Sequence, residues 1–201
     1  MKVLGITGGV GAGKSTVLAY LERVYQARVI ELDKVAHELM EPGQEGYQKI
    51  IEKFGEDILA PDGSIDRGML YQKAFSDRQR VEELNSIVHP LVKKEVCRKI
   101  EQERKKRTAA FVVLEAALLL EDHYDAICDE IWYIYVENDV RRERLKKSRG
   151  YSEEKIRSIL ENQKSDREFR IFCQFVVDNS SNIIENTYGQ IDKGLKEHEF
   201  V

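Results

Sequence analysis

The sequence predicts an α/β fold in which a five-stranded parallel sheet is flanked by helices. Three observations lead to this prediction: short apolar runs alternate with helical patterns, the apolar runs lack a polar residue at every second position, and a glycine-rich turn joins the first run to the first helical pattern. Strands of a parallel sheet are buried on both faces, which explains their unbroken apolar character. With 201 residues, 42% of them hydrophobic, the chain can form one core with an inserted lobe.

The predicted strands are apolar runs rich in β-branched or aromatic residues. They occupy residues 3–7, 28–32, 111–114, 131–136 and 175–177. After the first strand, the apolar residues of 15–25 fall on one face of a helix. Asp33 follows the second strand and is expected to cap a helix that ends at about Met40.

The middle of the chain is different in character. Residues 44–82 are polar and contain the turn signal Pro61-Asp62-Gly63, so they predict an inserted helical lobe. An amphipathic helix follows over about 84–100, with an interruption expected at His89-Pro90 because proline cannot donate a helical hydrogen bond. The highly charged residues 141–170 are also predicted to be helical, and a final helix closes the chain.

Composition excludes several classes of protein. A net charge of −4 argues against a module that binds duplex nucleic acid. Cys97, Cys128 and Cys173 are widely spaced and odd in number, which disfavours a disulfide framework or a structural zinc site. No apolar run approaches the ~20 residues of a membrane span, and the start lacks a signal-peptide pattern. We expect a cytoplasmic protein with no membrane association and no obligate protein partner.

The glycine-rich turn, Gly8-Gly9-Val10-Gly11-Ala12-Gly13-Lys14-Ser15, matches the phosphate-binding pattern G-x-x-x-x-G-K-[ST]. Such a loop folds around phosphate oxygens with its backbone N–H groups pointing inward, and the next helix adds the positive end of its dipole. Lys14 is expected to bridge the β- and γ-phosphates of ATP, and the Ser15 hydroxyl to hold Mg²⁺. The predicted ATP-binding residues are Gly8, Gly9, Gly11, Ala12, Gly13, Lys14, Ser15 and Thr16.

Other motifs narrow the class of phosphate-binding protein. The chain contains no D-x-x-G, which a switch GTPase would need, and no LSGGQ-type signature of a transport ATPase. Gln163-Lys164-Ser165-Asp166 only distantly resembles the guanine-reading NKxD, and it lies in a charged helical stretch. A small phosphotransferase is therefore the favoured class.

Two carboxylates follow predicted strands at the edge where such sheets bind ligands. Asp33, 19 residues after Lys14, is expected to take a proton from an attacking hydroxyl or to hold it in line, with a plain helix cap as the alternative. Glu115 ends the third strand and is expected to hold water on Mg²⁺, with a solvated strand end as the alternative.

A basic stretch follows the fourth strand. Residues 141–149 include six basic side chains and one acidic side chain. Arginines here are expected to offset charge on the transferred phosphoryl group and, on closure, to exclude water, with a solvated helix face as the alternative. His89 is a further candidate, for which packing or capping competes with substrate contact.

Together these motifs resemble the dephospho-coenzyme A kinase family over most of the chain. The similar segments are Gly5 to Thr16, Glu31-Leu32-Asp33, Glu41-Pro42-Gly43, Leu84 to Pro90, and the closing Val176-Val177-Asp178-Asn179-Ser180. The glycine loop is shared by many families, whereas the LNSIVHP and VDNS segments are more specific.

The resemblance implies transfer of the ATP γ-phosphate to the ribose 3′-hydroxyl of dephospho-CoA, the last step of coenzyme A synthesis. It implies that Asp33 activates this acceptor and that His89 lies on the acceptor side. Residues 36–90 would form the acceptor lobe and 138–170 a helical lid. The nucleotide-binding core would comprise residues 1–35, 91–137 and 171–201.

The chain departs from the family pattern at several positions. Glu31 replaces a usual Asp, Glu115-Ala116-Ala117-Leu118-Leu119 replaces D-x-P-L-L, and Arg141 stands where Gln is common. The lid spacing is one residue longer, so Arg149 and Arg144 are both candidates for the catalytic lid arginine. Two other functions stay open: a kinase for nucleoside monophosphates or shikimate-like alcohols, and a non-catalytic nucleotide-binding regulator.

Overall fold

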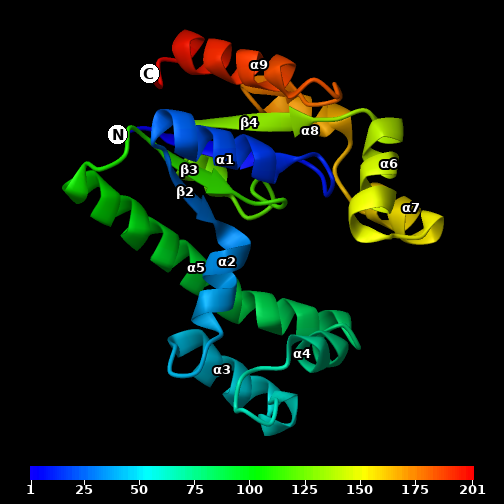
Figure 1. The fold of residues 1–201 in the computed structure, drawn as a ribbon. Helices are drawn as coiled ribbons and strands as arrows, with labels where there is room; N and C mark the ends of the chain where they lie inside the picture. Colours follow the sequence, from blue (N-terminus) through cyan, green and yellow to red (C-terminus); the bar gives the residue numbers. More distant parts are fainter. The chain divides into compact units, whose positions relative to one another are not determined.

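A computed structural model describes residues 1–201 (Figure 1). The chain forms two compact units, one made of residues 1–29 and 106–201 and the other of Ile30–Lys105. None of the helices combines the length and the apolar character that crossing a membrane requires.

The sheet has five strands in the order β2-β3-β1-β4-β5. The strands are β1 (Val3–Thr7), β2 (Arg28–Glu31), β3 (Val112–Glu115), β4 (Glu130–Tyr135) and β5 (Phe175–Asp178). The central strand β1 runs parallel to β3 and to β4, and β4 runs parallel to β5. The predicted α/β fold with a five-stranded parallel sheet is therefore confirmed.

The sheet is apolar because helices cover it. All five residues of β1 are buried, and Trp132 and Ile134 of β4 are almost fully buried. One core cluster joins these strands to α1 (Lys14–Tyr25) and α9 (Ile184–Glu197). Figure 1 shows α1 and α9 side by side, and the rings of Tyr20 and Tyr188 stack between them with centroids 3.8 Å apart.

Three short helices stand between β4 and β5: α6 (Asn138–Arg149), α7 (Glu153–Glu161) and α8 (Asp166–Phe172). Ser152 caps α7, and Ser165 forms a capping box with Glu168 at the start of α8. Helix α8 packs on the sheet, where Phe169 stacks on Tyr133 with ring centroids 4.5 Å apart. The Gln163–Asp166 segment, which distantly resembled a guanine-reading motif, thus contributes a helix cap.

The other unit is helical. It contains α2 (Leu32–Leu39), α3 (Glu45–Phe54), a 3-10 turn (Glu56–Ile58), α4 (Arg67–Ala74) and nearly all of α5 (Arg78–Lys106). It has a core cluster of its own, whose most buried members are Ile50, Phe54, Ile58, Leu70 and Ala74. Residues 36–90, the predicted acceptor lobe, lie within this unit, and their role in binding an acceptor stays a prediction.

Two local predictions are wrong. Helix α5 continues through Pro90 without a break, although an internal proline costs a helix about 3 kcal/mol. Leu84, Leu91 and Val92 are buried on either side of the proline, and each such side chain contributes about 1.5–3 kcal/mol on burial. Packing therefore outweighs the proline. The second error concerns Asp33: α2 begins at Leu32, so Glu31 is the N-cap residue and Asp33 lies in the first turn.

Helix α9 provides a matched pair of glycines that tests its packing. A Cβ at Gly194 would lie 2.7 Å from Cε1 of Phe175 and 2.8 Å from Cη2 of Trp132, so Gly194→Ala should lower the free energy of unfolding by about 1–3 kcal/mol. A Cβ at Gly189 meets no atom within 4 Å, so Gly189→Ala should raise it by about 0.5–1 kcal/mol through better helix propensity. Denaturant unfolding measures both, and equal effects would contradict this packing.

Candidate active site

The loop between β1 and α1 has a backbone that only glycine adopts readily. Gly8 has φ +147° and Gly13 has φ +85°, values that side chains with a Cβ rarely reach. A Cβ at Gly8 would also lie 2.6 Å from the carbonyl oxygen of Ile134, and a Cβ at Gly13 would collide with the amide of Asn179. Conformation and close packing therefore both require these glycines.

Side-chain donors engage every second carbonyl oxygen along this loop. The donor–acceptor pairs are Lys14 Nζ with Gly8 (2.8 Å), Arg141 Nε with Val10 (2.7 Å) and Asn179 Nδ2 with Ala12 (2.8 Å). A carbonyl oxygen repels phosphate, and a hydrogen bond from a cationic or amide donor offsets part of its negative charge. Within the loop the Ala12 N–H donates to the Gly9 carbonyl oxygen at 3.1 Å, and the other backbone N–H groups are suited to bind an anion.

The start of α1 adds to this preference for anions. Gly13 is the N-cap residue and provides no side-chain cap, and the first turn contains no acidic residue. The first N–H groups of the helix and the positive end of its dipole therefore face the loop without a protein anion to neutralise them. Ser15 and Thr16 are exposed in this turn and contribute to the lining of an open cavity of about 360 Å³.

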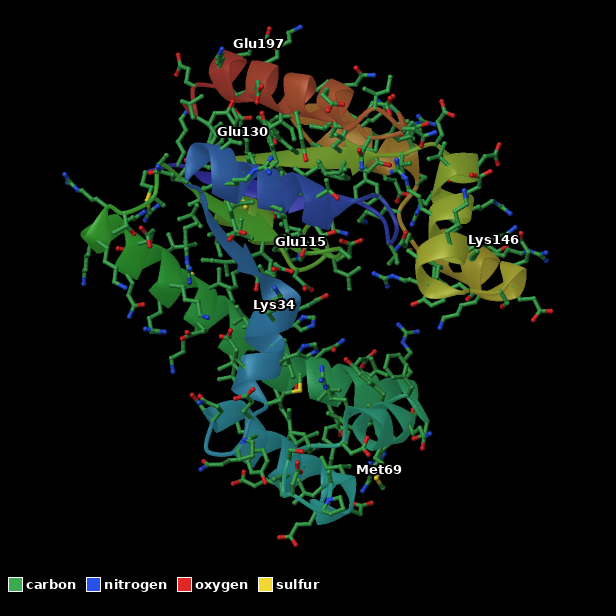
Figure 2. The ribbon with its side chains drawn as sticks, in the orientation of Figure 1. Lys34, Met69, Glu115, Glu130, Lys146 and Glu197 are labelled. Carbon is green, nitrogen blue, oxygen red and sulfur yellow. The ribbon has the colours of Figure 1, made fainter.

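Glu115 and Lys14 lie together beside the loop. Glu115 ends β3, one strand away from β1, and is labelled in Figure 2. Its Oε1 is 3.4 Å from the Lys14 Nζ, and each side chain is only 13% exposed. The Ser15 hydroxyl and the Glu115 carboxylate are hard oxygen donors of the kind that Mg²⁺ binds. The donor set therefore fits the predicted metal.

Asn179 holds the loop from the opposite side. It follows β5 directly and is 4% exposed. Besides donating to Ala12, its Oδ1 accepts a hydrogen bond of 2.9 Å from the hydroxyl of Thr187, which is fully buried in α9. The sequence contained a signal for this residue, because Asp178 and Asn179 are the first polar side chains after the strand predicted at residues 175–177. The pattern did not reveal its contact with the loop.

The two candidate lid arginines lie in different surroundings. Arg144, in the middle of α6, donates from Nη2 to the carbonyl oxygen of Ser181 at 3.4 Å, in the segment between β5 and α9. Arg149 is exposed at the end of α6, where its guanidinium contacts the Tyr151 hydroxyl at 3.4 Å. Of the two, Arg144 lies against the segment that also carries Asn179.

A family model described as dephospho-CoA kinase matches residues 2–185. The chain belongs to the dephospho-CoA kinase family. It is an ATP-dependent kinase with a place in coenzyme A biosynthesis. The family resemblance that the motifs predicted is thus confirmed.

Individual relatives agree with this family. The chain is 37% identical to the dephospho-CoA kinase of Carboxydothermus hydrogenoformans, over 95% of this chain and 91% of the relative. It is 36% identical to the dephospho-CoA kinase of Enterococcus faecalis, over 98% of this chain and 96% of the relative. A solved structure of a Thermus thermophilus protein aligns with a TM-score of 0.83 at 25% identity, covering 98% of this chain and 97% of that one.

The site residues predicted for this dephospho-CoA kinase family member divide between the two units. The glycine loop, Glu115 and Arg144 belong to the sheet-containing unit. Asp33 and His89 belong to the helical unit, where Asp33 is exposed in the first turn of α2 and His89 is exposed on α5. The catalytic and binding roles of all these residues stay predictions.

The Asn179 contacts lead to a test. Asn179→Ala would leave the Ala12 carbonyl and the Thr187 hydroxyl without their partner, so the free energy of unfolding should fall by about 1–3 kcal/mol. ATP binding should weaken by roughly tenfold, the equivalent of about one lost hydrogen bond. Calorimetry and denaturant unfolding measure the two effects. Asn186→Ala is the control, because Asn186 is exposed and bonds only within its own segment; similar losses in both variants would contradict the role of Asn179.

Proposed function

We propose that this kinase transfers the γ-phosphoryl group of ATP to the ribose 3′-hydroxyl of dephospho-CoA, giving coenzyme A and ADP. One arrangement carries the proposal. Three carbonyl oxygens of the glycine loop accept hydrogen bonds from side chains, and Lys14 and Glu115 lie 3.4 Å apart beside this loop. The acceptor is supported by relatives named dephospho-CoA kinase that match nearly the whole chain.

In this reaction the bond between the γ-phosphorus and the β–γ bridging oxygen breaks as the acceptor oxygen bonds to that phosphorus. The loop N–H groups and Lys14 bind the β- and γ-phosphates and neutralise the charge that reaches the leaving ADP. Arg144, with Arg149 as the alternative, adds positive charge at the transferred group. The Ser15 hydroxyl and, through water, the Glu115 carboxylate would hold Mg²⁺, which would supply further neutralisation of the phosphate oxygens.

Asp33 orients the 3′-hydroxyl and accepts its proton in this proposal. Its exposed position in the first turn of α2 leaves the carboxylate accessible to a substrate. A carboxylate in hydrogen-bond reach of an attacking hydroxyl contributes roughly 10²–10⁴-fold to the rate. His89 contacts the acceptor from α5.

The same proposal divides the chain by function. Residues 1–35, 91–137 and 171–201 bind the nucleotide, residues 36–90 bind the acceptor, and residues 138–170 form a lid that excludes water. The separate core of the helical unit supports an acceptor lobe, and the separately capped helix α7 supports a lid of short helices. Helix α8, which packs on the sheet, would anchor the end of that lid. The three free cysteines suit the reducing cytoplasm.

A panel of acceptors tests the proposed function. ADP release is measured with Mg-ATP and either dephospho-CoA, AMP or shikimate. Turnover with dephospho-CoA alone supports the proposal. Turnover only with another acceptor would make the protein a different small-molecule kinase, and nucleotide binding without turnover on any acceptor would make it a regulator.

Asp33→Asn tests the acceptor-activating carboxylate. The turnover number should fall by roughly 10²–10⁴-fold because an amide cannot take up the hydroxyl proton, while the affinity for ATP stays unchanged. Steady-state kinetics with dephospho-CoA and calorimetry with ATP separate the two effects. Glu185→Gln is the control, since Glu185 is an exposed carboxylate in the first turn of another helix, α9. Turnover near the wild-type value in Asp33→Asn would show that Asp33 does not activate the acceptor and only interacts with the dipole of α2.

Glu115→Gln tests the proposed role at the metal. The Mg²⁺ concentration that gives half-maximal activity should rise by about 10–100-fold, the usual cost of losing an outer-sphere partner of a bound metal. The measurement is a Mg²⁺ titration of the initial rate at saturating substrates. Glu101→Gln is the matched control, because Glu101 pairs with Arg104 on the exposed face of α5. A titration curve equal to that of the wild type would limit Glu115 to its contact with Lys14.

A further inference from the structure

Arg141 is a partly buried cation that has no anionic partner. It lies on α6, where its Nε donates to the carbonyl oxygen of Val10 at 2.7 Å and one Nη2 N–H donates to Oε1 of Gln163. Both acceptors are uncharged, and no carboxylate forms an ion pair with this guanidinium. The next residue differs, because Arg142 pairs with the Glu153 carboxylate at 3.7 Å.

This arrangement is costly for the protein alone. A buried charge is destabilising unless it is both paired and hydrogen-bonded. In agreement, burial lowers the pKa of the Arg141 guanidinium from its ordinary value, because the charged form loses hydration. The contacts with Val10 and Gln163 do not require a charge, since a neutral amide can also donate to a carbonyl oxygen, although more weakly. The positive charge therefore has a use beyond these two contacts.

The position of Arg141 indicates what that use is. The guanidinium lies against the middle of the glycine loop, so closely that a Cβ at Gly9 would collide with it. Two of the five N–H donors of an arginine are used by Val10 and Gln163. The others are available beside a loop whose backbone N–H groups bind phosphate.

We propose that Arg141 is a phosphate-binding residue, whose remaining N–H donors bind the β- or γ-phosphate of the nucleotide on the loop. A guanidinium binds phosphate oxygens through parallel N–H groups, and the phosphate supplies the anion that the protein does not. Arg141 thus joins Lys14 and the start of α1 in holding the nucleotide. This inference rests on the proposed function in one respect, that ATP is the phosphoryl donor.

Nucleotides with one, two and three phosphates test the inference in the intact kinase. Calorimetry with AMP, ADP and ATP is carried out on the wild type, Arg141→Gln and Arg141→Lys, without any acceptor. Arg141→Gln should weaken the binding of ATP by roughly 10- to 100-fold, the range for hydrogen bonds to charged groups. A similar loss for ADP identifies the β-phosphate as the partner, and an unchanged ADP affinity identifies the γ-phosphate. AMP binding should not change. Arg141→Lys should recover part of the loss because it keeps the charge but not the parallel N–H groups.

Thermal unfolding distinguishes phosphate binding from a purely structural role. Arg141→Gln removes a partly buried charge, which stabilises, and the hydrogen bonds to Val10 and Gln163, which destabilises. Its unfolding temperature without nucleotide should therefore change little, whereas the stabilisation by ATP should shrink. Arg104→Gln is the control and should keep wild-type nucleotide affinities, because Arg104 is exposed on α5 and pairs with Glu101 there. A lower unfolding temperature without nucleotide, together with unchanged affinities for ADP and ATP, would overturn the inference. Lack of turnover on dephospho-CoA would refute the proposed function alone, since these measurements need no acceptor.

Discussion

A loop that binds phosphate must present its amide groups to an anion, and it can do so only if its carbonyl oxygens are held elsewhere. In this kinase the carbonyl oxygens of Gly8, Val10 and Ala12 each accept a hydrogen bond from a side chain. Each such bond contributes about 1–3 kcal/mol when a buried or charged group takes part. Together they keep the loop in the form that binds an anion before the nucleotide arrives.

The side chains that hold the loop come from distant parts of the sequence. Lys14 belongs to the loop itself, but Arg141 comes from α6 after β4, and Asn179 follows β5. The strand order places β4 beside β1 and β5 beside β4, so parallel pairing brings both of these segments to the same edge of the sheet as the loop. The preparation of the site is therefore a consequence of assembling the sheet.

Helix α9 stabilises this arrangement from behind. Thr187 fixes the amide of Asn179, and Asp192 accepts hydrogen bonds from the hydroxyls of both Tyr20 and Tyr25 on α1. Burial and the neighbouring Asp192 carboxylate raise the pKa of the Tyr20 hydroxyl to about 12. Helix α9 thus supports both α1, which begins at the loop, and Asn179, which binds the loop.

The sequence by itself determined the strands, the glycine loop and the family, because an unbroken apolar run and a glycine pattern are local properties of the chain. Local patterns failed where a longer-range effect competes. Burial of neighbouring side chains keeps α5 helical through Pro90. Helix α2 begins at Leu32, so Asp33 lies in its first turn and is not its N-cap residue. Only the tertiary structure decided which side chains hold the loop, and that Arg141 is partly buried beside it without an anionic partner. The reason is that the loop contacts of Arg141 and Asn179 link residues more than 130 positions apart. At that separation the residues next to one partner carry no information about the other.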